Sequence, residues 1–270
     1  MVKNKQGHMN KLLGEGEGHP AHFVNENGTS PIVLVCEHAS NVLPKSLGTL
    51  GLSDEDMQRH IAWDIGAEGT SRILSKLLDA PLILQRYSRL VYDCNRPPEA
   101  DGAMPELSEI YEIPGNKNLL PSARLARTRE IYRPFHHAIE DYLDIRTAEK
   151  RPTILVTMHS FNPVYKGKSR EFDVGFLFDR DNWLANFLIK AFPSDKARLN
   201  EPYGPKDGVM HTTNLHAAPR GLKHVMIEIR NDLIANHAGQ NTWANHLTVP
   251  LAQAATILGG THDHRHAHAR

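Results

Sequence analysis

Short apolar runs alternate with longer helix-forming segments along most of this chain, and this alternation limits the possible folds more than any other feature. The runs are rich in β-branched residues and bounded by turn residues, which is typical of strands buried on both faces of a sheet. We expect strands at residues 31–36, 80–84, 89–92, 153–158, 172–178 and 223–229, and helices at 53–77, 123–150, 182–191 and 247–258. This order predicts an α/β fold, a three-layer α/β/α sandwich with a mostly parallel or mixed central sheet.

The two ends of the chain differ in composition from its middle. Residues 1–29 are polar and glycine-rich, and we expect a flexible N-terminal arm there. Residues 30–258 are expected to form a single α/β domain, which is within the size of one hydrophobic core. Residues 259–270 hold 4 of the 17 histidines and are expected to be a His-rich disordered tail.

The composition argues against several classes of partner. Lysine and arginine total 31 and aspartate and glutamate total 31, so the charge gives no reason to expect nucleic acid or an anionic membrane surface. No apolar run approaches the length of a membrane span or a signal peptide. The two cysteines, Cys36 and Cys94, lie within apolar runs, which predicts buried reduced thiols in a cytoplasmic protein. The sequence does not indicate an oligomeric state.

Two histidines follow predicted strands. His38 comes two residues after the run that ends at residue 36, and His159 directly follows the run 154–158. Ligands of α/β sheets bind outside the carboxyl ends of the strands, so both side chains are expected at one crevice. A histidine at a strand end is more often a hydrogen-bonded structural residue, but two at neighbouring strand ends favour a metal site.

A catalytic zinc site needs a third protein ligand and an open position for water. His60 and Asp64 are four residues apart, so within a helix both would lie on one face. Either could bind the metal, or His60 could orient a metal-binding side chain without contacting the metal itself. An ordinary ion pair on a solvated helix face is the alternative.

Glu228 is unusual because it lies inside the apolar run 225–229. A buried carboxylate is costly unless it is paired, and burial raises its pKa toward the range of a general acid or base. A structural ion pair with Arg230 or Arg96 would explain it equally well.

Arginines near the predicted strand 89–92 suggest a site for a carboxylate, since a guanidinium binds one through two parallel hydrogen bonds. The candidates there are Arg86, Arg89 and Arg96, with Asn95 beside the last. Arg230 shares a face of its strand with Glu228 and is a further candidate. A structural pair with Asp93 is the alternative.

Six short motifs, in order, resemble the N-formylglutamate amidohydrolase family. They are CEHAS at 36–40, HIAWDIGA at 60–67, SRLVYDCNRP at 88–97, TMHSF at 157–161, NEPYG at 200–204 and VMIEIRND at 225–232. The similarity runs from about residue 31 to 256. It implies a fold like that of zinc carboxypeptidases and zinc-dependent cell-wall amidases, that is, a zinc exopeptidase-like fold.

The resemblance also implies roles for particular residues. His38, Asp64 and His159 would hold one zinc ion per chain, Glu228 would be the catalytic acid/base, and Asn95 with Arg96 would hold the substrate carboxylate. Many relatives place the carboxylate ligand three residues after the first histidine, but that position is Asn41 here. A more distant ligand is therefore required, with Asp64 favoured and Glu37 as a rival.

The expected activity is hydrolysis of a small-molecule carboxylate, N-formylglutamate, to formate and glutamate in amino-acid catabolism. His211 or His216 could stabilise the oxyanion. The alternatives are a zinc hydrolase of the same fold acting on another N-acyl amino acid or a short peptide, and a non-catalytic protein that binds metal or a small acid.

Overall fold

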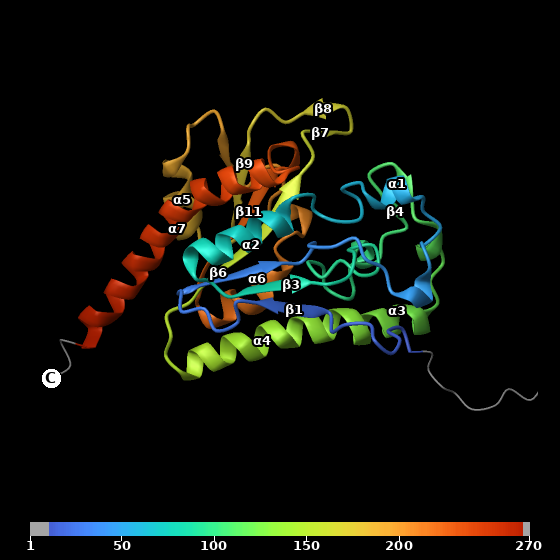
Figure 1. Ribbon diagram of the computed structural model, residues 1–270, viewed down its shortest axis with the longest axis horizontal. Helices are drawn as coiled ribbons and strands as arrows, with labels where there is room; N and C mark the ends of the chain where they lie inside the picture. The colour runs from blue at the N-terminus through green and yellow to red at the C-terminus, as the bar shows by residue number, and fades with distance from the viewer. Residues whose placement is uncertain (1–10, 267–270) are drawn as a thin grey trace, which may run out of the picture.

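The computed structural model describes residues 11–266, and its centre is a seven-stranded sheet (Figure 1). The strand order is β1-β3-β2-β6-β11-β9-β10. The strands are β1 (Ala21–Val24), β2 (Ile32–Cys36), β3 (Leu82–Gln85), β6 (Ile154–Phe161), β9 (Val174–Leu177), β10 (Ala197–Leu199) and β11 (Lys223–Arg230). The four central strands β3, β2, β6 and β11 are parallel. The strand β1 pairs with β3 antiparallel, whereas β9 pairs with β11 antiparallel and with the edge strand β10 parallel. The sheet is therefore mixed and largely parallel, as predicted.

Helices cover both faces of the sheet. On one face lie α2 (Ala67–Leu78), α5 (Trp183–Leu188) and α7 (His237–His266), and on the other lies α4 (Arg133–Ala148) (Figure 1). Alternate residues of β2 enter different cores, because successive side chains of a strand point to opposite faces. Leu34 packs with α2 and α7, while Val35 packs with α4. The expected three-layer α/β sandwich is confirmed.

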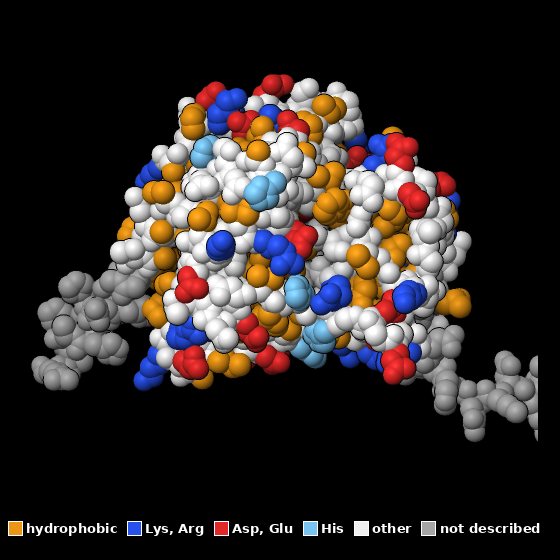
Figure 2. Space-filling view, in the orientation of Figure 1, with side chains coloured by type: hydrophobic (Ala, Val, Ile, Leu, Met, Phe, Trp, Pro, Cys, Tyr) orange, Lys and Arg blue, Asp and Glu red, His pale blue; other side chains and the backbone are white. Residues whose placement is uncertain are grey.

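The remaining elements are short. They are the helices α1 (Asp54–Met57), α3 (Pro121–Arg127) and α6 (His211–His216), and two hairpins, β4 (Leu107–Ser108) with β5 (Tyr111–Glu112) and β7 (Val164–Tyr165) with β8 (Lys168–Ser169). Basic and acidic side chains are interspersed over the face shown in Figure 2, in line with the equal totals of the two signs.

The structure differs from the expected ends of the domain. The arm expected over residues 1–29 is wrong for residues 21–24, which form β1 and pair with β3. At the other end α7 continues to His266, inside the segment expected to be a disordered tail. Residues 1–10 and 267–270 lie outside the described part of the chain.

The predicted helix over 53–77 is two helices separated by turns. Ser53 does cap the first one, accepting a hydrogen bond from the Asp56 backbone. Gly66 has a φ of 79°, and a Cβ there would lie 2.1 Å from the Ile234 carbonyl oxygen. Positive φ does not continue a right-handed helix, so α2 starts only at the next residue. His60 and Asp64 consequently lie in the turns and do not share a helix face.

The predicted strand 89–92 is absent, and its apolar residues are buried in turns. Side chains satisfy the backbone groups that a neighbouring strand would have bonded. The Asn116 amide donates to the Leu90 carbonyl oxygen, and Arg127 donates to that of Val91. The predicted helix over 123–150 is α3 and α4 joined by a π-helical segment at 128–132, and Pro134 is the second residue of α4.

Candidate functional site

The carboxyl ends of the central parallel strands bring the predicted ligands together. His38 lies two residues beyond β2, while His159 lies within β6, which is longer than predicted. Glu228 pairs in register with His159 on the neighbouring strand β11. The turn that carries Asp64 is held to the His38 segment by a hydrogen bond of 2.9 Å from the Asp64 backbone nitrogen to the His38 carbonyl oxygen. These long-range contacts place four buried polar side chains at one edge of the sheet.

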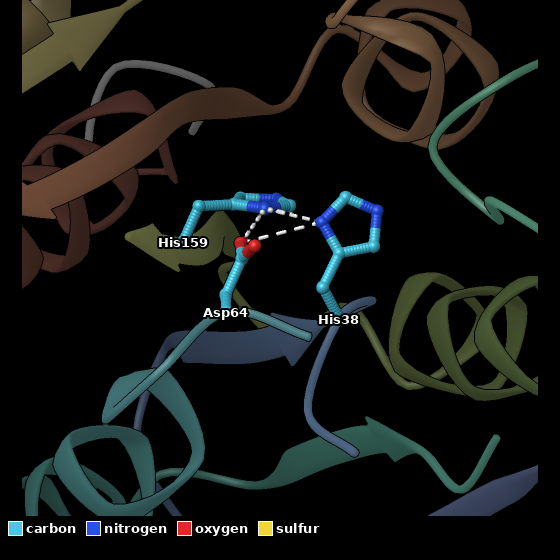
Figure 3. Close-up of side chains that lie close together, drawn as sticks. All are labelled: His38, Asp64 and His159. Atoms are coloured by element: carbon cyan, nitrogen blue, oxygen red, sulfur yellow. Dashed lines mark hydrogen bonds and ion pairs between the residues drawn. The ribbon is translucent and has the colours of Figure 1, made fainter. Parts of the chain in front are cut away.

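Three donor atoms converge at this edge (Figure 3). The Asp64 Oδ2 lies 3.3 Å from His38 Nδ1 and 2.9 Å from His159 Nδ1, and the two imidazole nitrogens are 3.2 Å apart. Ligands about 2.1 Å from a tetrahedral zinc ion are about 3.4 Å from each other. The donor types and their spacing therefore fit a divalent metal such as zinc, bound by two imidazoles and one carboxylate.

The outer nitrogen of each histidine faces a further buried carboxylate. His38 Nε2 lies 2.7 Å from Asp93 Oδ1, and His159 Nε2 lies 3.1 Å from Glu37 Oε2. A metal-binding histidine usually directs its other N–H to a carboxylate, which fixes the tautomer that leaves the inner nitrogen free. Glu37 therefore lies behind His159 rather than among the three donors, which does not support it as a rival ligand.

The buried charges perturb the ionisation of the site. Burial would raise the pKa of Asp64, but the charge of His38 and hydrogen bonds from both histidines hold it well below its usual range. Burial lowers the pKa of His159, yet the charges of Glu37 and Asp64 outweigh this and raise it well above the ordinary value. Metal binding at these nitrogens would therefore release protons.

The pKa values of Glu228 and His60 are shifted in the directions opposite to those of Asp64 and His159. Burial raises the pKa of Glu228 to about 7, a shift that the charge of His159 opposes and that of Asp64 reinforces. Burial lowers the pKa of His60 to about 4, so its imidazole is neutral at neutral pH. His60 Nδ1 lies 3.6 Å from Asp64 Oδ1, on the side of that carboxylate away from the three donors.

A cavity of about 280 Å³ opens onto these groups. Besides His38, Asp64, His159 and Glu228, it is lined by His60, Ile61, Arg89, Asp93, Asn95, Arg96, Ser108, Glu109, Ser160, Tyr165, Tyr203, Asp207 and Val209. Arg96 lies at its wall and donates a hydrogen bond to the Asp207 backbone carbonyl. It forms no ion pair with any residue in the described part of the chain.

Asn95 also lines the cavity, but its side-chain amide bonds the backbone. It donates to the Val209 carbonyl oxygen and accepts from the Thr212 backbone nitrogen at 3.1 Å. Both of its polar atoms are thus engaged, and the side chain joins the Asn95–Arg96 segment to the segment that begins α6. Arg96 lies on the first of these two segments, at the wall of the cavity.

Four residues considered for the site lie elsewhere, since none of them lines the cavity: Arg86, His211, His216 and Arg230. The Arg86 guanidinium donates to the His19 carbonyl oxygen, and His211 Nε2 lies 2.8 Å from the Tyr132 hydroxyl oxygen. Arg230 does not line the cavity, and its guanidinium pairs with Asp173 at 3.1 Å and Asp232 at 2.8 Å. Sharing a strand face with Glu228 was insufficient because Arg230 is the last residue of β11, beyond the donors. His216 is also outside the cavity, and its Nε2 lies 2.8 Å from His136 Nδ1.

The ion pair between Arg89 and Asp93, given above as the alternative to a carboxylate-binding role, is present, whereas the contacts of Asp93 with His38 and of Arg89 with Asp64 were not predicted. Arg89 donates to Asp64 at 3.2 Å and to Asp93 at 2.8 Å, so one guanidinium bridges a predicted ligand and the carboxylate behind His38. The signal for Asp93 was present. It is a carboxylate within the apolar run 90–94, which is the same anomaly that singled out Glu228.

The model of the N-formylglutamate amidohydrolase family matches residues 30–235, which is most of the chain. The chain belongs to this family. Membership supports amide hydrolysis as the class of reaction and confirms the resemblance carried by the six motifs. Among curated proteins none matches this member of the family.

Two solved structures are similar to this family member. A gene product from Agrobacterium tumefaciens is 47% identical, with a TM-score of 0.89 over 92% of this chain and 99% of that chain. An N-formylglutamate amidohydrolase from Ralstonia eutropha is 16% identical, with a TM-score of 0.64 over 90% of this chain and 99% of that one. The second likeness shows the fold alone. None of the helices in the described residues is sufficiently long and apolar to cross a membrane.

Proposed function

We propose that this protein is a zinc-dependent amidohydrolase that converts N-formylglutamate to formate and glutamate. The observation that carries the proposal is the convergence of His38, Asp64 and His159 beside a buried carboxylate, Glu228, in one cavity. A structural ion pair would not require two imidazoles and an aspartate to direct three donor atoms at one point.

Zinc held by the three donors would supply a Lewis acid, polarising the amide carbonyl and lowering the pKa of water to about 7. The protein's own contribution begins with orientation. Asp93 accepts a hydrogen bond from His38 Nε2, and Glu37 lies 3.1 Å from His159 Nε2 as its ion-pair partner, which keeps the inner nitrogens directed at the centre of the site.

Glu228 is proposed to move the protons. Its carboxylate accepts a proton from the attacking water as the C–O bond forms, and then donates it to the amide nitrogen as the C–N bond breaks. A pKa of about 7 suits both steps, because the group can accept and return a proton near neutral pH. Its in-register pairing with His159 places it beside the three donors.

Arg96 is proposed to bind the carboxylate of the acyl amino acid. It lines the cavity, and its hydrogen bond to the Asp207 backbone carbonyl leaves other guanidinium donors for a ligand. Holding the substrate at a charged end, away from the scissile amide, orients the amide relative to Glu228.

The proposal is tested by measuring formate release from N-formyl-L-glutamate by the zinc-loaded protein and by two variants. Glu228→Gln should keep its zinc and lose about 10²–10⁴-fold in turnover, which is the usual contribution of a general acid or base. Glu68→Gln is the matched control, since among the described residues Glu68 forms an ion pair with Arg72 alone, on the outside of α2. Absence of formate release by the unaltered protein, or near-normal turnover by Glu228→Gln, would contradict the proposal.

A zinc hydrolase acting on another N-acyl amino acid or a short peptide is the second candidate. It is favoured by a second cavity beside the first, with His60, Ile61 and Glu109 lining both.

A further inference from the structure

Glu109 is a carboxylate of the catalytic cavity without an assigned role or, among the described residues, an ion-pair partner. Glu109, in the turn of the β4–β5 hairpin, lines the cavity and is half-buried. Its Oε1 accepts a hydrogen bond of 2.7 Å from the Asn162 amide, whose own oxygen accepts one of 2.7 Å from Asn231. Among the described residues no lysine, arginine or histidine forms an ion pair with Glu109. The carboxylate is thus oriented by neutral amides, with its negative charge unbalanced.

The backbone at this position makes the glutamate more informative. Glu109 has a φ of 55°, in the left-handed region that glycine occupies most easily in a two-residue hairpin turn. Ile110 beside it is exposed, so the turn does not bury apolar surface there. A longer side chain is therefore present at a position where local geometry alone favours glycine, and it points to the catalytic cavity.

A second cavity of about 280 Å³ adjoins the first on this side. His60, Ile61 and Glu109 line both cavities, whereas Arg96 lines only the first. The substrate carboxylate can thus bind at the Arg96 end of the site, and the acyl side of the substrate can extend toward the second cavity.

The charges around the second cavity leave Glu109 as the unbalanced group. Arg59 lines it too, but its guanidinium pairs with Glu55 and, at 3.2 Å, with Asp56. This end of the site therefore favours a positive charge, in contrast to the Arg96 end.

We infer that Glu109 binds the ammonium group of an aminoacyl substrate, so that the protein hydrolyses dipeptides whose terminal carboxylate is held by Arg96. The inference rests on the proposed function, since the same ligands and Glu228 would perform the hydrolysis. Water adds to the peptide carbonyl, the C–N bond breaks, and the proton from water goes to the leaving nitrogen, which yields two amino acids. A formyl group carries only hydrogen on its carbonyl carbon and leaves this end of the cavity unfilled.

The test compares glycyl-, propionyl- and formyl-L-glutamate at pH 7. Glycyl and propionyl groups have nearly the same size and differ by an ammonium in place of a methyl group. The zinc-loaded protein should prefer the glycyl over the propionyl compound by about tenfold in kcat/KM, from one charge-assisted hydrogen bond. Glu109→Gln should lose most of that preference, while Glu112→Gln should keep it, since Glu112 lies on the same hairpin and pairs outside the cavity with Lys117.

Equilibrium binding to the Glu228→Gln variant by calorimetry separates this inference from the proposed function. The glycyl compound should bind about tenfold more tightly than the propionyl compound, and adding Glu109→Gln should remove the difference. If the preference for the glycyl compound survives Glu109→Gln, direct binding of the amine by zinc explains the preference and the inference is overturned. Equal binding of the two compounds, or binding of neither, would also overturn the inference. Hydrolysis of formylglutamate without a glycyl preference refutes the inference alone, whereas failure to hydrolyse any of the three amides refutes the proposed function.

Discussion

Replacing Asp93 by asparagine should weaken metal binding without removing a ligand. Asp93 Oδ1 lies 2.7 Å from the outer nitrogen of His38, and Asp93 is itself held by Arg89 at 2.8 Å and by the Asn95 backbone nitrogen at 3.0 Å. Burial would raise the pKa of Asp93, but the charges of His38 and Arg89 hold it well below the usual range. The carboxylate is therefore ionised throughout the working pH range and makes the His38 imidazole a stronger donor to a metal.

The expected magnitude follows from the loss of that charge. Substituting the carboxylate behind a metal-binding histidine costs about 10–100-fold in metal affinity, which corresponds to roughly 1.4–2.7 kcal/mol at 25 °C. Asparagine keeps the size of the side chain and an oxygen acceptor, so the fold and the three donors should remain in place. The effect is thus expected on the dissociation constant for zinc rather than on the number of zinc ions bound.

The measurement is competition for zinc against a chromophoric chelator, with protein unfolding by denaturant followed in parallel. Asp144→Asn is the control, because Asp144 pairs with Arg220 on the surface, away from the cavity. An unchanged zinc affinity in Asp93→Asn would refute the claim that His38 binds through its inner nitrogen with Asp93 behind it. Equal weakening in Asp144→Asn would do the same.

Three further outcomes follow from particular contacts. Arg96→Lys should raise KM for formylglutamate about tenfold with little change in kcat, as expected when uniform substrate binding is lost, and steady-state kinetics will show it. Gly66→Ala should destabilise the fold by about 1–3 kcal/mol and weaken zinc binding, because a Cβ at this position would meet the Ile234 carbonyl. Denaturant unfolding should show a smaller loss of unfolding free energy for the control Gly48→Ala, because Gly48 has a φ of 56° but open space around it. Burial lowers the pKa of His136 to about 4, so the unfolded state binds a proton at this histidine first as pH falls below about 6.5, and acidification reduces the stability of the fold. The difference in unfolding free energy between pH 7 and pH 5 should therefore be smaller by about 2 kcal/mol in His136→Gln. An unchanged difference would contradict the burial of the neutral imidazole.

The central sheet could be predicted because each of its buried strands has a recognisable apolar sequence pattern. The runs that became β2, β6 and β11 are continuous and apolar, as burial on both faces requires, and parallel strands of this kind bring His38 and His159 to one edge. The short edge strand β1 has only one fully buried residue and was read as part of an arm. Edge strands with mostly half-buried residues carry too weak a pattern to be distinguished from loops.

The third donor could not be chosen from the local sequence. The spacing of His60 and Asp64 suggested a helix, yet Gly66 delays the helix and the Asp64 backbone instead bonds His38, far away in the chain. The family resemblance favoured Asp64 where the four-residue spacing left both His60 and Asp64 as candidates. Arg230 was wrong for a different reason. The alternation of side chains along a strand indicates which face a residue lies on, but not how far along the strand the site is.

The most direct test of the account is the anomalous scattering of a crystal of the zinc-loaded protein, recorded on either side of the zinc absorption edge. One strong peak is expected between His38 Nδ1, Asp64 Oδ2 and His159 Nδ1, with Glu228 beside it. A peak bound by other side chains, or a zinc-loaded crystal with no density between those three atoms, would contradict it.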